Sequence, residues 1–137
     1  MTTILETEGA TRVGIRAQAY INQAYLRVIH TGVHEQIAVM TLPFDTELGE
    51  KVRPATDQLF LVVDGVGEAR VGDCQLAVEA GDLIPVEAGT RYNIVNRATL
   101  PLRLITVFAP PVYAPGTIHE TMEAHEPPVA EGWRPFP

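Results

Sequence analysis

The fold is decided by residues 81–96, GDLIPVEAGTRYNIVN. Two short segments in this stretch, LIPV at 83–86 and YNIVN at 92–96, are rich in the β-branched and aromatic residues that favour strands. Gly81 precedes the first segment and Gly89 lies between the two, and glycine readily adopts the positive φ that turns between strands need. The stretch therefore predicts two short strands joined by a tight turn.

Similar segments recur along most of the chain. Turn residues such as Asp64-Gly65 and Gly72-Asp73 separate them, and no pattern before residue 109 predicts a helix. The predicted strands cover residues 25–30, 34–42, 58–64, 68–71, 75–78, 83–86, 92–96 and 102–108. Many short strands at intervals of about ten residues indicate an all-β sandwich or barrel.

The spacing within residues 81–96 resembles the second motif of the cupin superfamily. That motif reads glycine, five residues, proline, one residue, glycine, two residues, histidine, three residues, asparagine. Gly81, Gly89 and Asn96 occupy the matching places. Tyr92 stands where the superfamily has a metal-binding histidine. The resemblance implies an all-β jelly-roll barrel, also called a double-stranded β-helix.

Residues 49–65, GEKVRPATDQLFLVVDG, resemble the first cupin motif. Counting back from Gly65, Gln58 falls on the position of a metal-binding glutamate. Lys51 and Arg53 then fall on the positions of two metal-binding histidines. All four metal positions of the superfamily are therefore occupied by other residue types in this chain.

The chain divides into three predicted parts. Residues 1–23 are expected to form an N-terminal arm, residues 24–109 the cupin barrel, and residues 110–137 a Pro-rich C-terminal segment that packs on the barrel. A resemblance to small single-domain bacterial cupins of the mannose-6-phosphate-isomerase-like group covers most of residues 20–121. That label describes kinship of fold and implies little about a reaction.

The composition narrows the expected partners and location. Ten Lys and Arg stand against 17 Asp and Glu, a net charge of −7, and no basic stripe is present, which argues against nucleic-acid binding. No apolar run approaches the ~20 residues that span a bilayer, and residues 1–10 lack the features of a signal peptide. We expect a cytoplasmic protein that binds neither nucleic acid nor membranes.

Two predicted strands, residues 59–63 and 102–108, are largely apolar on both faces. One face of each fills the core, and the other needs a cover that a partner subunit would supply. We therefore expect a homodimer. The alternative is a sandwich that covers both faces internally.

The residues at the four metal positions suit a metal poorly. Lysine and arginine are cations at neutral pH, glutamine offers one carbonyl oxygen, and protonated tyrosine is a weak ligand. We expect no metal and no other cofactor. The alternative is an unusual metal site built from His34, His119 and Gln58.

Arg53 is expected to replace the positive charge of the metal. Its guanidinium can hold a carboxylate or an enolate-like oxygen through two hydrogen bonds. Side chains alternate along a strand, so Gln58 and Phe60 would face inward from one predicted strand and Tyr92 from another. All three side chains would then line the same cavity. The alternative is a register shifted by one residue, or an inert pocket, in which Arg53 faces solvent.

Two histidines, His34 and His119, fall in segments that match the resembling group. If either faced Tyr92, the pair could act as base and acid, because imidazole titrates near neutral pH. Tyr92, His34 and His119 are therefore the candidate catalytic residues. The alternative is that both histidines are structural or exposed.

The leading prediction is a metal-free cupin that binds a small oxygen-rich or anionic organic molecule in its barrel. A first alternative is a cofactor-independent isomerase, epimerase or lyase that uses Tyr92, a histidine and Arg53. A second is a metal-dependent cupin enzyme with unusual ligands, and a third is a structural or regulatory dimer with a filled barrel. Packing of Phe60, Ile94 and Tyr92 across the barrel would favour the third alternative.

Overall fold

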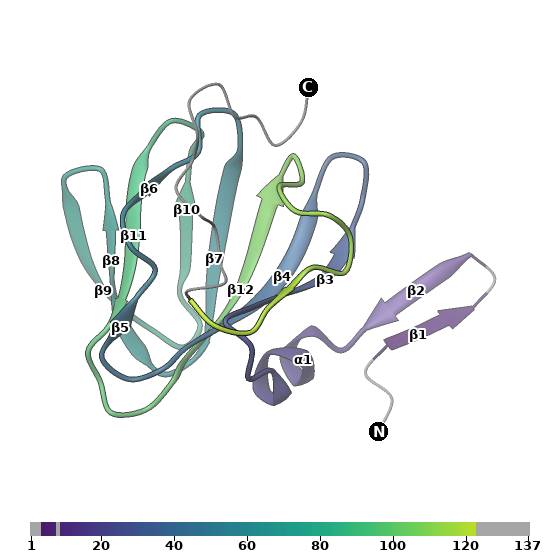
Figure 1. Ribbon diagram of the computed structural model, residues 1–137, viewed down its shortest axis with the longest axis horizontal. Helices are drawn as coiled ribbons and strands as arrows, with labels where there is room; N and C mark the ends of the chain where they lie inside the picture. The colour runs from purple at the N-terminus through teal and green to yellow at the C-terminus, as the bar shows by residue number, and fades with distance from the viewer. Residues whose placement is uncertain (1–3, 8, 123–137) are drawn as a thin grey trace.

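The computed structural model describes residues 4–7 and 9–122, which form two main antiparallel sheets that face each other (Figure 1). The six-stranded sheet runs in the order β10 (Leu83–Val86), β7 (Asp57–Asp64), β12 (Leu102–Ala109), β4 (Gln36–Leu42), β3 (Leu26–Thr31) and β13 (Ile118–His119). The five-stranded sheet contains β5 (Thr46–Glu47), β11 (Arg91–Asn96), β8 (Val66–Val71) and β9 (Cys74–Glu79), and β6 (Lys51–Val52) also pairs with β11. A separate hairpin pairs β1 (Ile4–Thr7) with β2 (Ala10–Val13). This arrangement confirms the predicted all-β double-stranded β-helix.

One apolar core lies between the two main sheets. Strand β7 shows how it forms, because successive side chains of a strand point to opposite faces of the sheet. Phe60 and Val62 are fully buried in this core, whereas Leu59 and Leu61 between them are exposed on the outside. The other strands follow the same period and add large side chains to the centre, among them Ile94, Leu102, Leu104 and Phe108.

The N-terminal arm contains a helix that the sequence pattern did not predict. Helix α1 (Ile15–Ile21) packs on the outer face of the six-stranded sheet, where Ala19 is fully buried beside Val39 and Ile105. The prediction of no helix before residue 109 is therefore wrong. A seven-residue helix is unstable alone, so this one depends on tertiary packing that no local pattern reveals. Within the described residues, no helix is long and apolar enough to cross a lipid bilayer.

Residues 110–122 belong to the predicted C-terminal segment. They cross the end of the six-stranded sheet and continue into β13, which pairs with β3 at its edge. Tyr113 in this crossing packs against the main core. Residues 123–137, including the rest of the predicted segment, lie outside the described residues.

Asn96, the asparagine of the second motif, ties two loops together. Its side chain is fully buried, and Nδ2 lies 3.0 Å from the carbonyl oxygen of Leu42, 3.1 Å from that of Pro43 and 2.9 Å from that of Leu100. Its Oδ1 accepts a hydrogen bond from the backbone N–H of Ala98 at 3.0 Å. Asn96 therefore satisfies buried backbone groups and has a structural role.

Gly65, the last glycine of the first motif, forms the turn between β7 and β8. Its φ of 94° lies in the left-handed region that disfavours other residues. A Cβ atom at this position would meet the carbonyl oxygen of Pro101 at 2.6 Å. Both the turn and the close approach of a second chain segment therefore require glycine here.

Candidate functional site

Gln58 and Tyr92 meet inside the barrel. Both side chains are buried, and the Tyr92 hydroxyl donates to Gln58 Oε1 at 2.6 Å. Gln58 Nε2 donates to Thr106 Oγ1 at 2.9 Å, and the Thr106 hydroxyl donates to the carbonyl oxygen of Leu59 at 3.0 Å. Because the single proton of Thr106 goes to that carbonyl, Thr106 can only accept from Gln58, and the Gln58 amide must turn its oxygen toward Tyr92.

This chain of hydrogen bonds does not fit a metal. Gln58 and Tyr92 occupy two of the four metal positions, yet they bond directly to each other and the tyrosine proton lies between their oxygens. The other two positions hold cationic side chains, and the described residues contain no group of three or more His, Cys, Asp or Glu able to hold a metal ion. We therefore derive no chemical step through a metal.

The purified protein is expected to contain far less than one transition-metal ion per chain. The reason is that the Tyr92–Gln58 hydrogen bond takes up both oxygens that could serve as ligands. Elemental analysis after growth with excess manganese, iron, nickel and zinc measures this directly. A full equivalent of metal that is lost in the Tyr92→Phe variant would contradict the assignment.

Arg53 lies against two aromatic rings, those of Phe108 and Tyr113. Its guanidinium carbon lies 5.3 Å from the centre of the Phe108 ring and 5.8 Å from the centre of the Tyr113 ring. Arg53 Nη2 also donates to the Tyr113 hydroxyl at 3.1 Å. Val52 beside it is 48% exposed, so the register that turns Arg53 inward is the one adopted.

Tyr113 connects Arg53 to His119. The Tyr113 ring contacts the Phe108 ring edge-on, with centroids 5.5 Å apart, and the His119 ring in the same manner at 5.5 Å. His119 is carried there by β13 at the edge of the six-stranded sheet. We call Arg53, Phe108, Tyr113 and His119 the arginine cluster.

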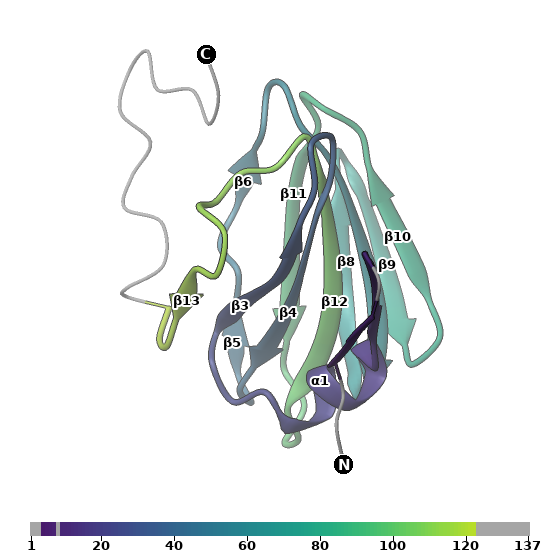
Figure 2. The same cartoon turned by 90° about the vertical axis from the view of Figure 1, so that its right-hand side faces the viewer.

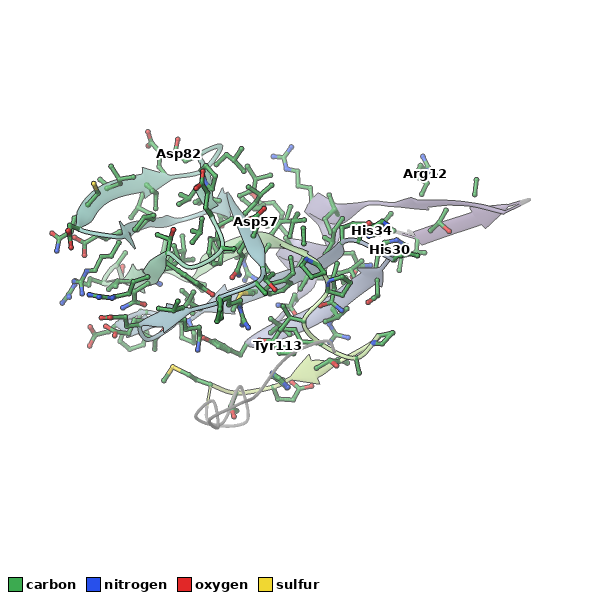
Figure 3. All side chains as sticks on the ribbon, turned by 90° about the horizontal axis from the view of Figure 1, so that it is seen from above. Arg12, His30, His34, Asp57, Asp82 and Tyr113 are labelled. Carbon is green, nitrogen blue, oxygen red and sulfur yellow. The ribbon has the colours of Figure 1, made fainter. Side chains whose placement is uncertain are left out.

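His34 and Tyr92 lie in different environments, so the condition under which they could act together as base and acid is not met. His34 is exposed in the turn between β3 and β4, whereas Tyr92 is buried in the core. Figure 3 shows His34 beside His30 and well apart from Tyr113. The alternative metal site of His34, His119 and Gln58 is likewise not assembled, because His34 is exposed in that turn and Gln58 is buried.

Gln36 holds the cluster in place, and sequence reasoning missed it. Its side chain is fully buried at the start of β4. Gln36 Oε1 accepts from the backbone N–H groups of Val112 and Tyr113 at 3.1 and 3.0 Å, and Nε2 donates to the carbonyl oxygen of Tyr113 at 2.7 Å and to Thr31 Oγ1 at 2.9 Å. The sequence feature that could have indicated Gln36 is a polar residue at the start of an otherwise apolar run. For Tyr113, the corresponding feature is an aromatic residue within a Pro-rich segment.

The floor of the barrel is filled with side chains. Phe60 and Ile94 are fully buried, and the Phe60 ring packs against Tyr92 with centroids 5.7 Å apart. Phe60 therefore lies in the packed core together with Tyr92. This packing was the observation expected to favour a filled barrel.

Comparisons with known proteins agree with this architecture. The family described as cupin domain matches residues 38–108, and the chain belongs to that family. It is 31% identical to the uncharacterized protein YrkC of Bacillus subtilis over 115 residues, which are 80% of this chain and 62% of YrkC. It is 30% identical to the uncharacterized protein L612 of Acanthamoeba polyphaga mimivirus, over 77% of this chain and 69% of L612.

Solved structures show the same fold. The crystal structure of BH2720 from Bacillus halodurans superposes with a TM-score of 0.80 at 31% identity, over 82% of this chain and 89% of BH2720. The cupin domain of Cnp3 from Schizosaccharomyces pombe superposes with a TM-score of 0.66 at 17% identity, over 81% of this chain and 86% of that domain. At that identity, the second likeness concerns the fold alone.

Proposed function

We propose that this protein is a metal-free cupin that binds a small oxygen-rich or anionic organic molecule at the arginine cluster. The observation that carries the proposal is the Arg53 guanidinium, half-buried and stacked against two aromatic rings in the position where cupins hold a metal ligand. A guanidinium fixed in this way presents a planar set of donors that matches a carboxylate. The ligand would lie above the filled barrel floor.

The geometry also limits what Tyr92 can do toward a ligand. Its proton is directed to Gln58 Oε1, and the amide orientation is set in turn by Thr106. Tyr92 would have to break this buried hydrogen bond to act as an acid. His119 belongs to the arginine cluster, where its ring contacts Tyr113. The site is therefore better suited to binding a ligand than to proton transfer through Tyr92.

A structural or regulatory dimer is the second candidate function. It is favoured by the packing of Phe60, Ile94 and Tyr92, which fills the floor of the barrel. A purely structural protein would show no response to small acids or sugars. The ligand experiment below therefore separates the two candidates.

A ligand that saturates the arginine cluster is expected to raise the melting temperature by roughly 10 °C. The basis is that binding at 100 times Kd stabilises the native state by about 2.7 kcal/mol. The measurement is a thermal-shift screen of acetate, malonate, malate, citrate, gluconate, glucose 6-phosphate and neutral sugars. An acid that shifts the native protein should leave Arg53→Ala unshifted and shift Arg53→Lys less, because lysine keeps the charge but loses the planar donors.

Arg97→Ala is the matched control, because Arg97 is exposed and follows β11 outside the arginine cluster. This variant should respond like the native protein. Equal shifts in Arg53→Ala and the native protein would refute the proposed site. No shift with any acid or sugar would favour the structural dimer.

A further inference from the structure

Strand β9 forms one edge of the five-stranded sheet, and the β8–β9 hairpin lies at the left of Figure 1. The strand pairs with β8 along its whole length, from Cys74 opposite Val71 to Glu79 opposite Val66, and no strand of the described residues lies on its other side. Every second residue of an edge strand directs its N–H and C=O groups away from the sheet, where they form a template for a further strand.

Glu79 shows which backbone groups of β9 point outward. Its N–H donates to Asp82 Oδ2 at 2.8 Å, and its carbonyl oxygen accepts from the Asp82 N–H at 3.0 Å. Because the direction repeats at every second residue, the N–H and C=O groups of Gln75 and Ala77 point the same way. Within the described part of the chain, no residue bonds to these outward groups of Gln75 and Ala77. We call them the open edge.

The other strands that end the two main sheets are poor templates. Strand β10, at the right of Figure 2, has four residues and contains Pro85, which has no N–H to donate. Strands β13 and β5 have two residues each. With six residues and neither proline nor lysine among them, β9 lacks these protections.

The inner face of the open edge is apolar. Leu76 points to the same side of the sheet as Val78, which is buried in the core, yet Leu76 is 50% exposed. Ala69, opposite Leu76 on β8, is fully buried, so the exposure of Leu76 arises on its outer side, where no described strand follows. An apolar residue of an added strand would pack against Leu76.

The outer face of the open edge favours a long basic side chain. Ala77 is small and lies opposite Glu68, and both line a hollow of about 550 Å³ on the outer face of the sheet. A long side chain beside Ala77 can therefore extend over it toward Glu68. Arg70 contacts Oε2 of Glu68 at 3.1 and 3.3 Å, which leaves Oε1 as an acceptor. Arg97 also lines the hollow, but it follows β11, on the far side of β8 from the edge.

The charge around the open edge is negative. Residues 64–82 contain five acidic residues and one basic residue, and the whole chain has a net charge of −7. The acidic residues are Asp64, Glu68, Asp73, Glu79 and Asp82. Such a surface attracts basic segments and repels acidic ones. A second copy would bring the same charges on its own β9, so pairing between two β9 edges is disfavoured.

We propose that the open edge of β9 binds an extended segment of another protein in which basic and apolar residues alternate. The segment adds to the sheet as a strand through backbone hydrogen bonds to Gln75 and Ala77, while one apolar residue packs on Leu76 and one basic side chain reaches Glu68. Because successive residues of a strand point to opposite faces, these two residues are neighbours in the partner's sequence. The interaction is separate from the arginine cluster, none of whose residues lies on β8 or β9.

Binding of a defined peptide tests the proposal. The probe is a short blocked peptide of alternating lysine and valine, labelled with fluorescein, and its control has the same residues with the lysines and the valines in separate blocks. Fluorescence anisotropy should show the alternating peptide binding at least roughly tenfold more tightly than the block peptide, and less tightly as salt is added. Hydrogen exchange at the amides of Gln75 and Ala77 should slow only with the alternating peptide.

Three variants locate the binding site. Ala77→Pro removes an outward N–H that is not bonded to β8, a position where an edge strand tolerates proline, and it should weaken binding at least about tenfold. Leu76→Lys should weaken binding in the same way and carries the test if Ala77→Pro does not fold. Leu83→Lys is its matched control, because Leu83 is similarly exposed on the edge of the other sheet, and this variant should bind like the native protein.

Equal binding of the two peptides would reveal a diffuse charge effect and overturn the proposal. The same holds for a folded Ala77→Pro or Leu76→Lys variant that binds the alternating peptide as tightly as the native protein does. Analytical ultracentrifugation without peptide gives the remaining outcome. A native dimer that Ala77→Pro dissociates would overturn the proposal as well, because a second copy of the chain would then occupy the open edge.

Discussion

Replacing Tyr92 with alanine is expected to lower the free energy of unfolding by about 3–5 kcal/mol. The Tyr92 side chain is buried, packs against Phe60 and donates a hydrogen bond to Gln58 Oε1. The substitution would leave a cavity in the barrel floor and a buried carbonyl oxygen without its donor. Urea unfolding followed by circular dichroism measures the change.

Tyr92→Phe separates the two contributions. It keeps the ring and removes the hydroxyl, so the loss should be about 1–3 kcal/mol, the cost of an unsatisfied buried acceptor. Exposed Tyr20, changed to alanine, controls for the loss of an aromatic residue and should change stability far less. A Tyr92→Ala variant as stable as the native protein would mean that the barrel floor is not packed as described.

Replacing Gln36 with leucine is expected to cost about 3 kcal/mol, because several buried backbone groups lose their partner and each such loss costs about 1–3 kcal/mol before relaxation. Those groups are the N–H groups of Val112 and Tyr113 and the carbonyl oxygen of Tyr113. Because Gln36 positions Tyr113, the variant should also lose the ligand-dependent thermal shift. Denaturant unfolding and the thermal-shift screen provide the two readouts.

Thr31→Val is the matched control for Gln36. It removes a single hydrogen bond to Gln36 Nε2 and leaves the three backbone bonds to residues 112 and 113 intact. We expect a stability loss below about 1.5 kcal/mol and an unchanged response to ligand. A Gln36→Leu variant that kept the full response while losing stability would show that Gln36 supports the fold without positioning the arginine cluster.

The buried half of the candidate site could be predicted from the sequence. Gln58, Phe60 and Tyr92 lie on strands, where the period of two tells which side chains share the inner face. The motif spacing placed Gln58 and Tyr92 at equivalent metal positions, and the structure brings these two side chains into contact. The turn glycines were predictable as structural residues because their roles follow from the strands on either side. The same holds for the hydrogen bonds of Asn96 to Ala98 and Leu100, but its bonds to Leu42 and Pro43 reach 54 and 53 residues along the chain.

The outer half of the site could not be predicted in this way. Tyr113 reaches Arg53 across 60 residues of sequence, and Gln36 reaches Tyr113 across 77. The path of residues 110–117 through space has no periodicity, so nothing local relates Tyr113 to either partner. The side that His34 faces could not be predicted for a similar reason, since a turn residue beside a strand end can face the barrel or solvent with the same sequence.

By itself, the sequence determined the class of fold, the cupin motifs and the replacement of every metal position by a residue poorly suited to a metal. These properties depend on residue type and on spacing along single strands, which the chain carries locally. The tertiary structure decided that Tyr92 donates to Gln58, that Arg53 packs against Phe108 and Tyr113, and that the N-terminal hairpin extends away from its own sheets. These properties arise from contacts between distant segments, whose geometry is set by how the two sheets and their loops pack.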